Sequence, residues 1–189
     1  MSAGIAEFYS RQAAKGLCDV RLGVEATVDS VLAEAPDVVV IATGSQPLRM
    51  ALPGGAPVFT VHEALEGAAD TAAKVVIFDR EGFSRPFVVA DALSARGIQV
   101  AFLTALAEVG SLLDQHMRDE MIQQLQARGV TFTAGVAPAG WLEPGRLLVR
   151  NTSTAEEHVI DDVDALVAAV GSASVSDLAD ALRGHVPEL

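Results

Sequence analysis

Hydrophobic positions along this chain follow two periods, which divide it into short strands and helices. Runs of apolar residues without alternation, as in Val38–Ala42 and Ala165–Val170, are typical of strands covered on both faces. Helical periods and glycine stops predict helices at 3–16, 26–35, 87–96, 114–128 and 176–183. Strands are predicted at 19–22, 37–42, 74–79, 98–104, 130–136 and 164–170.

The clearest part of this pattern is a strand–helix–strand unit in the middle of the chain. Its elements at 74–79, 87–96 and 98–104 together have the usual size of a parallel crossover, about 30 residues. A loop with three prolines is expected at 46–57, and an antiparallel hairpin or meander at 141–160. The sequence therefore predicts an α/β fold, with a Rossmann-like parallel sheet and an inserted antiparallel meander.

Composition and charge narrow the classes of function. The net charge of −12 disfavours nucleic acid and anionic membranes as partners, because both need a positive surface. No apolar run approaches the roughly 20 residues of a membrane span, and the first residues lack the pattern of a signal peptide. The single cysteine, Cys18, rules out an internal disulfide and favours a reducing compartment, so we expect a cytoplasmic protein.

The segment 37–47, with its Ala-Thr-Gly-Ser-Gln-Pro ending, resembles the strand and loop that close the FAD domain of pyridine nucleotide–flavin oxidoreductases. The order that follows is also similar: a proline-rich crossover, a βαβ unit, a meander, and a second strand ending in glycine. In particular, the chain resembles the C-terminal half of the trimethylamine dehydrogenase and 2,4-dienoyl-CoA reductase group. In that group a TIM barrel with FMN and a 4Fe–4S cluster precedes two Rossmann-like domains. The resemblance implies a partial FAD/ADP-type half-domain from residues 1–72 and 161–189, and a degenerate NAD(P)-type domain at 73–160.

Several features of that family are missing from this sequence. The first FAD-domain unit, with its Gly-x-Gly-x-x-Gly turn, would precede residue 1, and a Gly-Asp segment near the flavin would follow Leu189. A barrel is absent, and Cys18 alone cannot hold an iron–sulfur cluster. We therefore expect a middle slice of a larger architecture, whether an independent subunit, a remnant or a fragment.

The turn after the strand at 74–79 has lost the glycines of a dinucleotide site. Glycines there allow a tight turn and a close approach of the backbone to the pyrophosphate, but Asp79, Glu81 and Ser84 stand at those positions. Two carboxylates would repel a phosphate, and Thr104 replaces the acid that would bind a ribose hydroxyl. Arg80 and Arg85 either bind a phosphate directly or pair with Asp79 and Glu81, and the sequence favours pairing.

The loop Thr43-Gly44-Ser45 is the candidate cofactor site, because by resemblance it lies near the adenine of a bound FAD or ADP. Without the phosphate loop, we expect the chain to bind no cofactor by itself, with FAD or ADP as the alternative. No catalytic residue is predicted. The four histidines lack metal-ligand spacing, so no metal site is predicted either.

The function expected from this sequence is that of an accessory or structural module of an FMN/iron–sulfur oxidoreductase, of the amine dehydrogenase or dienoyl reductase type. The alternative is an electron-transfer subunit that binds FAD or an adenine nucleotide. The sequence leaves open whether the chain is an enzyme and favours a non-catalytic part of an oxidoreductase. The expected partner is a larger FMN/iron–sulfur barrel subunit or a second copy of the chain, because a half-domain exposes a sheet edge.

Overall fold

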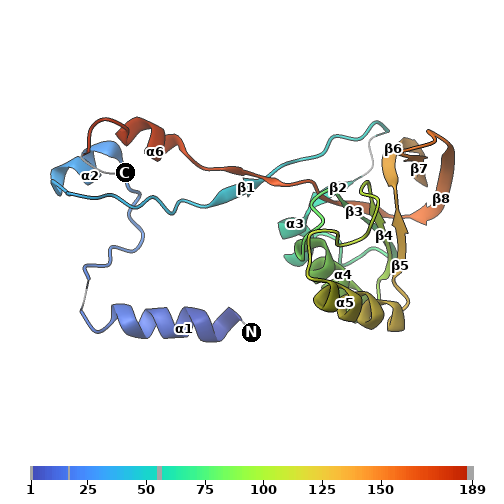
Figure 1. Cartoon of the computed structure of the whole chain (residues 1–189), viewed down its shortest axis with the longest axis horizontal. Helices are drawn as coiled ribbons and strands as arrows, with labels where there is room; N and C mark the ends of the chain where they lie inside the picture. The colour runs from blue at the N-terminus through green and yellow to red at the C-terminus, as the bar shows by residue number, and fades with distance from the viewer. Residues whose placement is uncertain (1, 17, 55–56, 187–189) are drawn as a thin grey trace. The chain divides into compact units, whose positions relative to one another are not determined.

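The computed structural model describes residues 2–16, 18–54 and 57–186, and these fall into two compact units. Unit 1 comprises residues 1–43 and 175–189, and unit 2 comprises residues 44–174. Unit 1 contains the helices α1 (Ser2–Ala13), α2 (Val28–Ala33) and α6 (Asp177–Leu182) (Figure 1). No described helix is long and apolar enough to cross a bilayer.

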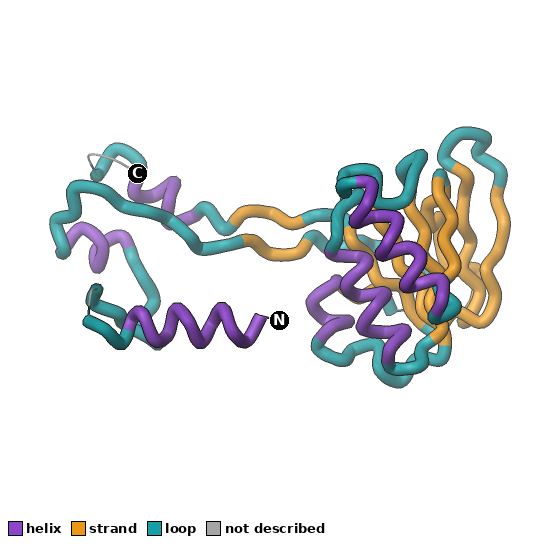
Figure 2. Tube along the Cα trace, turned by 60° about the horizontal axis from the view of Figure 1, so that its bottom comes forward, coloured by secondary structure: helices purple, strands orange, loops and turns teal. Residues whose placement is uncertain are grey.

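Unit 2 is built on a parallel sheet of five strands in the order β2-β9-β3-β4-β5. The strands are β2 (Val58–Thr60), β9 (Ala165–Ala169), β3 (Lys74–Asp79), β4 (Gln99–Thr104) and β5 (Thr131–Ala134). Helices α3 (Val61–Leu65), α4 (Arg85–Ala95) and α5 (Gln115–Ala127) cover one face of this sheet (Figure 2). The predicted α/β fold with a Rossmann-like parallel sheet is confirmed.

The other face of the parallel sheet packs on an antiparallel meander. Its strands are β6 (Val136–Glu143), β7 (Gly145–Asn151) and β8 (Glu157–Val163), paired in chain order. A further short antiparallel pair joins β1 (Ser45–Pro47) to β10 (Ser172–Ser174). The predicted meander is therefore present, and it begins at Val136, earlier than the sequence indicated.

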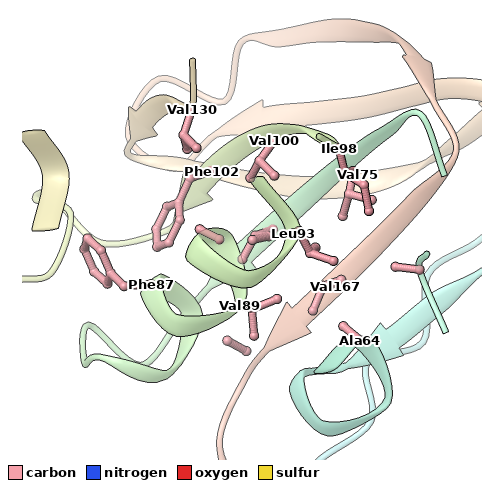
Figure 3. Close-up of a cluster of buried hydrophobic side chains, with 14 of the residues drawn as sticks. Ala64, Val75, Phe87, Val89, Leu93, Ile98, Val100, Phe102, Val130 and Val167 are labelled. Atoms are coloured by element: carbon pink, nitrogen blue, oxygen red, sulfur yellow. The ribbon is translucent and has the colours of Figure 1, made fainter. Parts of the chain in front are cut away.

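Alternation along the central strands sends side chains into two separate cores. In β3, Val75 and Ile77 pack under the helices, whereas Val76 and Phe78 pack against the meander. Figure 3 shows the helix-side core, in which Phe87 of α4 lies on Phe102 of β4 with ring centroids 5.1 Å apart. A strand with buried side chains on both faces has no polar period, which explains why the central strands read as continuous apolar runs.

Two predicted strands in unit 1 are wrong. Residues 19–22 form no strand. Residues 37–42, expected to be a buried strand, contain only an isolated bridge at Val38, and Val38 and Val40 are 53% and 85% exposed. Hydrophobic pattern gives a segment's preference for extended structure but cannot supply the neighbouring strands that would bury it.

Further differences lie between residues 44 and 73 and at the predicted strand 130–136, which the structure divides between β5 and β6 of different sheets. The predicted loop at 46–57 begins inside β1, and neither β2 nor α3 was predicted. The two compact units also have other bounds than the predicted half-domain (1–72 with 161–189) and Rossmann-like domain (73–160). This follows from the sheet order, because β2 and β9 pair with each other and β9 also pairs with β3.

Candidate functional site

The carboxyl ends of β3 and β9 form the place where a dinucleotide binds in sheets of this kind. The chain runs from β3 through α4 to β4 on one side, while β9 lies on the other side of β3. In open α/β sheets, ligands bind at the carboxyl ends of the strands where the order switches in this way. The turn between β3 and α4, residues 80–84, and the residues after β9 therefore define the candidate site.

A buried carboxylate organises the turn. Asp79 is fully buried, and its Oδ1 accepts hydrogen bonds from the backbone N–H groups of Glu81 at 2.7 Å and Gly82 at 3.0 Å. These N–H groups are the kind of donors that a glycine-rich turn offers to a phosphate. Here a side chain of the protein takes the place of that anion.

The other carboxylate oxygen of Asp79 has no hydrogen-bond partner among the described residues. Burial raises the pKa of the Asp79 carboxyl, and the hydrogen bonds from Gly82 and Glu81 oppose that rise. A buried carboxylate with a single satisfied oxygen carries a desolvation cost, which the surrounding fold must offset.

Glu81 closes the same region from the other side. Its carboxylate accepts two hydrogen bonds from Arg85, from Nε at 2.9 Å and from Nη2 at 2.8 Å. It also accepts from the backbone N–H of Gly171 at 2.9 Å, just after β9. Arg85 in turn donates from Nη1 to the hydroxyl of Ser172 at 2.8 Å. The Glu81 side chain is only 9% exposed, so this network fills the crevice between the two strand ends.

The predicted pairing of arginines with acids is thus confirmed for Arg85 and wrong for Arg80. Asp79 accepts from backbone donors, and within the described ranges Arg80 forms no ion pair. The Arg80 side chain is exposed, while its backbone N–H donates to the carbonyl of Ala169 at 2.9 Å. In this turn the pair that forms joins Glu81 in the loop to Arg85 at the start of α4, four residues later.

Helix α4 offers an anion one backbone donor fewer than a helix start without proline. Pro86 lies in its first turn and has no N–H. At the end of β4, Thr104 is fully buried and holds the backbone together. Its hydroxyl donates to the Asp79 carbonyl at 3.1 Å and accepts from the Leu106 N–H at 3.2 Å. Thr104 therefore serves the strand ends rather than a ribose.

The predicted cofactor residues Thr43, Gly44 and Ser45 are all exposed. In unit 1, the Thr43 hydroxyl donates to the carbonyl of Val175. In unit 2, Gly44 has a φ of +76° and open space at its Cβ position, and Ser45 begins β1 opposite Ser174. Nothing in the structure tests whether these residues bind a nucleotide, so this site stays a prediction. No cluster of three potential metal ligands occurs among the residues with assigned positions.

Two contributions to the site escaped sequence reasoning. The role of Asp79 as an acceptor for the turn was missed. Aspartate side chains commonly accept hydrogen bonds from the backbone N–H groups two and three residues later, as Asp79 does here. The contact of Glu81 with Gly171 joins residues 90 positions apart, and no local signal predicts it.

Comparison with known proteins shows which larger enzymes contain this fold. No protein-family model matches the sequence. A 2-naphthoyl-CoA reductase structure matches 98% of this chain with a TM-score of 0.81 and 26% identity. Histamine dehydrogenase from Rhizobium sp. 4-9 matches 87% of it with a TM-score of 0.75 and 18% identity. The chain has the fold of the C-terminal FAD/NAD-binding region of trimethylamine dehydrogenase-like enzymes. The resemblance seen in the sequence is thereby confirmed.

A similar curated protein is the N,N-dimethylglycine/sarcosine dehydrogenase of Chromohalobacter salexigens, which is 28% identical over 174 residues. That match covers 85% of this chain but 25% of the relative, and the two structures are covered to 28% each. The chain thus spans about a quarter of the length of the proteins it resembles. It is related to the FAD/NAD-binding region of flavin oxidoreductases. Because the match is limited to that region, it does not extend to the activities of the whole enzymes.

Proposed function

We propose that this chain is an accessory, non-catalytic part of a flavin-dependent oxidoreductase of the amine dehydrogenase or dienoyl reductase type. The observation that carries the proposal is the closed turn after β3. Its N–H donors at Glu81 and Gly82 are taken by Asp79, and the adjoining Gly171 N–H is taken by Glu81. The NAD-type site of this region is therefore filled by the protein's own carboxylates.

Charge supports the same conclusion. A pyrophosphate entering the turn would meet two carboxylates at short range, at a cost of several kcal/mol in a partly desolvated site. The Arg85 guanidinium cannot compensate, because Glu81 already accepts from two of its nitrogens and Ser172 from the third. The expected role of unit 2 is therefore to provide a folded scaffold for a larger flavin enzyme, with an FMN/iron–sulfur barrel subunit as the partner.

The test is a titration of the full chain with NADH and with ADP, measured by isothermal calorimetry. We expect no saturable heat up to about 1 mM ligand, which corresponds to binding weaker than about 4 kcal/mol. The matched variants are Arg80→Ala and Arg85→Ala. Saturable binding by the wild-type chain that either variant removes would show that these guanidinium groups bind phosphate, and would overturn the proposal.

A second candidate is an electron-transfer subunit that binds FAD or ADP at Thr43–Ser45. One observation favours it: the exposed Gly44, with its positive φ and open Cβ position, lets a ligand approach the backbone closely. Replacement of Gly44 by valine would then abolish flavin retention. If the purified chain carries no flavin to begin with, this candidate is eliminated.

A further inference from the structure

Two short strands of unit 2 lie where the chain enters and leaves it. Unit 2 comprises residues 44–174, so β1 and β10 are its first and last elements. They pair over three positions, from Ser45 opposite Ser174 to Pro47 opposite Ser172, and we call this pair the β1–β10 ribbon. Pro47 has no N–H to donate, and a two-stranded ribbon by itself is at best marginally stable in water. The ribbon therefore needs other contacts within unit 2 to stay formed.

The end of the ribbon nearest the parallel sheet continues into residues that pack on a core. Val170, just after β9, and Met50, three residues after β1, pack against the core between the sheet and the meander. Between them, the Leu48 N–H donates to the carbonyl of Gly171 at 3.0 Å. This backbone bond marks the root of the ribbon.

Two charged side chains reach the root from the connection between β3 and α4. The Glu81 carboxylate accepts from the Gly171 N–H at 2.9 Å, and the Arg85 guanidinium donates to the Ser172 hydroxyl at 2.8 Å. Glu81 and Arg85 also bind each other, at 2.9 and 2.8 Å. Hydrogen bonds that involve an ionised group are stronger than neutral ones. The two side chains thus join the carboxyl end of β3 to the first residue of β10.

Gly171 is the residue at which the two sets of contacts meet. Its N–H donates to Glu81, and its carbonyl accepts from Leu48. Its φ of +107° is a conformation that glycine adopts without strain, and it lies just where the chain leaves β9 for β10. Because one residue holds both bonds, we expect a loss of the Glu81 carboxylate to loosen the bond from Leu48 as well.

We propose that Glu81 and Arg85 form a latch that holds the β1–β10 ribbon to the carboxyl end of the parallel sheet. The carboxylate that fills the NAD-type turn then has a second role, because it also fixes the two strands through which the chain enters and leaves unit 2. The inference goes beyond the proposed function and can fail separately from it. The titration with NADH tests whether the turn accepts a nucleotide, whereas the latch concerns the opening of the ribbon.

The experiment measures backbone amide hydrogen exchange of the full chain, labelled with ¹⁵N, by NMR. The readout is the amide of Leu48, because it donates to Gly171 and not to a latch side chain. In the wild-type chain we expect this amide to be protected and yet to exchange faster than the amides of β3 and β4. That difference would show that the ribbon opens locally, without unfolding of the sheet.

Three variants weaken the latch to different extents. Glu81→Ala should accelerate exchange at Leu48 at least about tenfold, because it removes the acceptor of the Gly171 N–H together with the ion pair. Arg85→Ala and Ser172→Ala should each accelerate it at least about threefold, since both remove the bond to the Ser172 hydroxyl. Ser172→Ala leaves the ion pair of Glu81 with Arg85 in place and is the mildest of the three.

Arg96→Ala is the matched control for the loss of an ion pair. Arg96 follows α4 in the same unit and pairs with Asp70, and its side chain is 39% exposed, against 42% for Arg85. We expect this variant to leave the exchange of the Leu48 amide unchanged, because the Asp70 pair lies outside the latch.

Three results would overturn the inference. The first is a Leu48 amide that is unprotected in the wild-type chain, since the ribbon would then not be held. The second is a rate at Leu48 that Arg85→Ala and Ser172→Ala leave unchanged, and these two variants decide the question if Glu81→Ala does not fold. The third is an equal acceleration by Arg96→Ala, which would show that exchange at Leu48 follows the stability of the whole unit.

Discussion

Removal of Glu81 is the perturbation that most clearly separates a closed turn from a loose one. Its carboxylate accepts from Arg85 at 2.9 and 2.8 Å and from the Gly171 N–H at 2.9 Å, while its side chain is only 9% exposed. Glu81→Ala removes all three bonds and leaves a part-buried backbone N–H without a partner.

The size of the effect follows from these contacts. The unsatisfied Gly171 N–H costs about 1–2 kcal/mol. Arg85 is 42% exposed, so its pairing with Glu81 contributes about 1 kcal/mol after screening by solvent. We therefore expect Glu81→Ala to lower the free energy of unfolding by about 2–3 kcal/mol. Arg85→Ala should lower it by about 1–2 kcal/mol, because it also leaves Glu81 without its ion-pair partner.

The assay is urea unfolding at neutral pH, followed by the fluorescence of Trp141. This residue is the only tryptophan of the chain and is 6% exposed in unit 2. A double-mutant cycle of Glu81→Ala and Arg85→Ala should give a coupling energy of about 1 kcal/mol. Arg80→Ala is the matched control, since Arg80 is exposed, and we expect it to change stability by less than about 0.5 kcal/mol.

A coupling energy below about 0.3 kcal/mol would refute the reasoning, because it would place the pair among surface ion pairs without measurable effect. A stability loss for Arg80→Ala as large as that for Arg85→Ala would refute it as well. The first result would mean that the pair of Glu81 and Arg85 does not stabilise the turn after β3, and the second that Arg80 contributes as much as Arg85.

Three further predictions concern unit 2. The raised pKa of Asp79 means that the folded state holds the proton of this carboxyl more tightly than the unfolded state does. Asp79 therefore lowers the free energy of unfolding as the pH rises above 3.8, the ordinary pKa of the group. Asp79→Asn should remove that decline in urea unfolding measured across pH, and an unchanged profile would contradict the prediction. The pKa of Glu63 is lowered from 4.5 to about 2, first by the Thr60 N–H and then by Arg49. The stabilisation by Glu63 is therefore present above pH 4.5 and lost as the pH falls towards 2. Glu63→Gln should reduce the loss of unfolding free energy over this acidic range, with Glu66→Gln as the matched control. Phe102→Ala should lower the free energy of unfolding by about 3–5 kcal/mol, because it opens a cavity beside the two remaining rings, Phe87 and Phe132. Phe83→Ala, at a ring that is 52% exposed, should change it by less than about 0.5 kcal/mol.

The strand–helix–strand unit of the sheet was predictable from sequence because local and tertiary preferences agree there. The strand predicted at 74–79 has the observed bounds, and the strand predicted at 98–104 begins one residue early. Both carry apolar residues on two faces, and both faces are covered in the fold. The predicted helix at 87–96 begins two residues late, because Arg85 and Pro86 already belong to its first turn.

Elements that depend on distant partners were not predictable. Strand β2 has only three residues and exists because β9 pairs with it, about 108 positions along the chain at Val58 and Leu166. Helix α3 had a usable signal, since Thr60 and Glu63 form a capping box with the spacing of that motif. In unit 1, the apolar run at Val38–Ala42 indicated a buried strand, but burial requires neighbours that the described residues do not provide.

The candidate site was half predictable. The loss of the glycines and the pairing of an arginine with an acid in this turn follow from the residue types. That Asp79 would accept from two N–H groups of the turn depends on its full burial, which the sequence does not reveal. Likewise, the bond from Gly171 to Glu81 requires β9 to lie beside β3.

The claim that this chain is an accessory module without its own redox cofactor is tested most directly by one spectrum. The full chain, purified without added cofactor, is measured from 300 to 500 nm, and flavin is assayed after denaturation. We predict no flavin absorbance bands and no released flavin. Flavin bands at close to one equivalent per chain would contradict the account and assign the chain an electron-transfer role of its own.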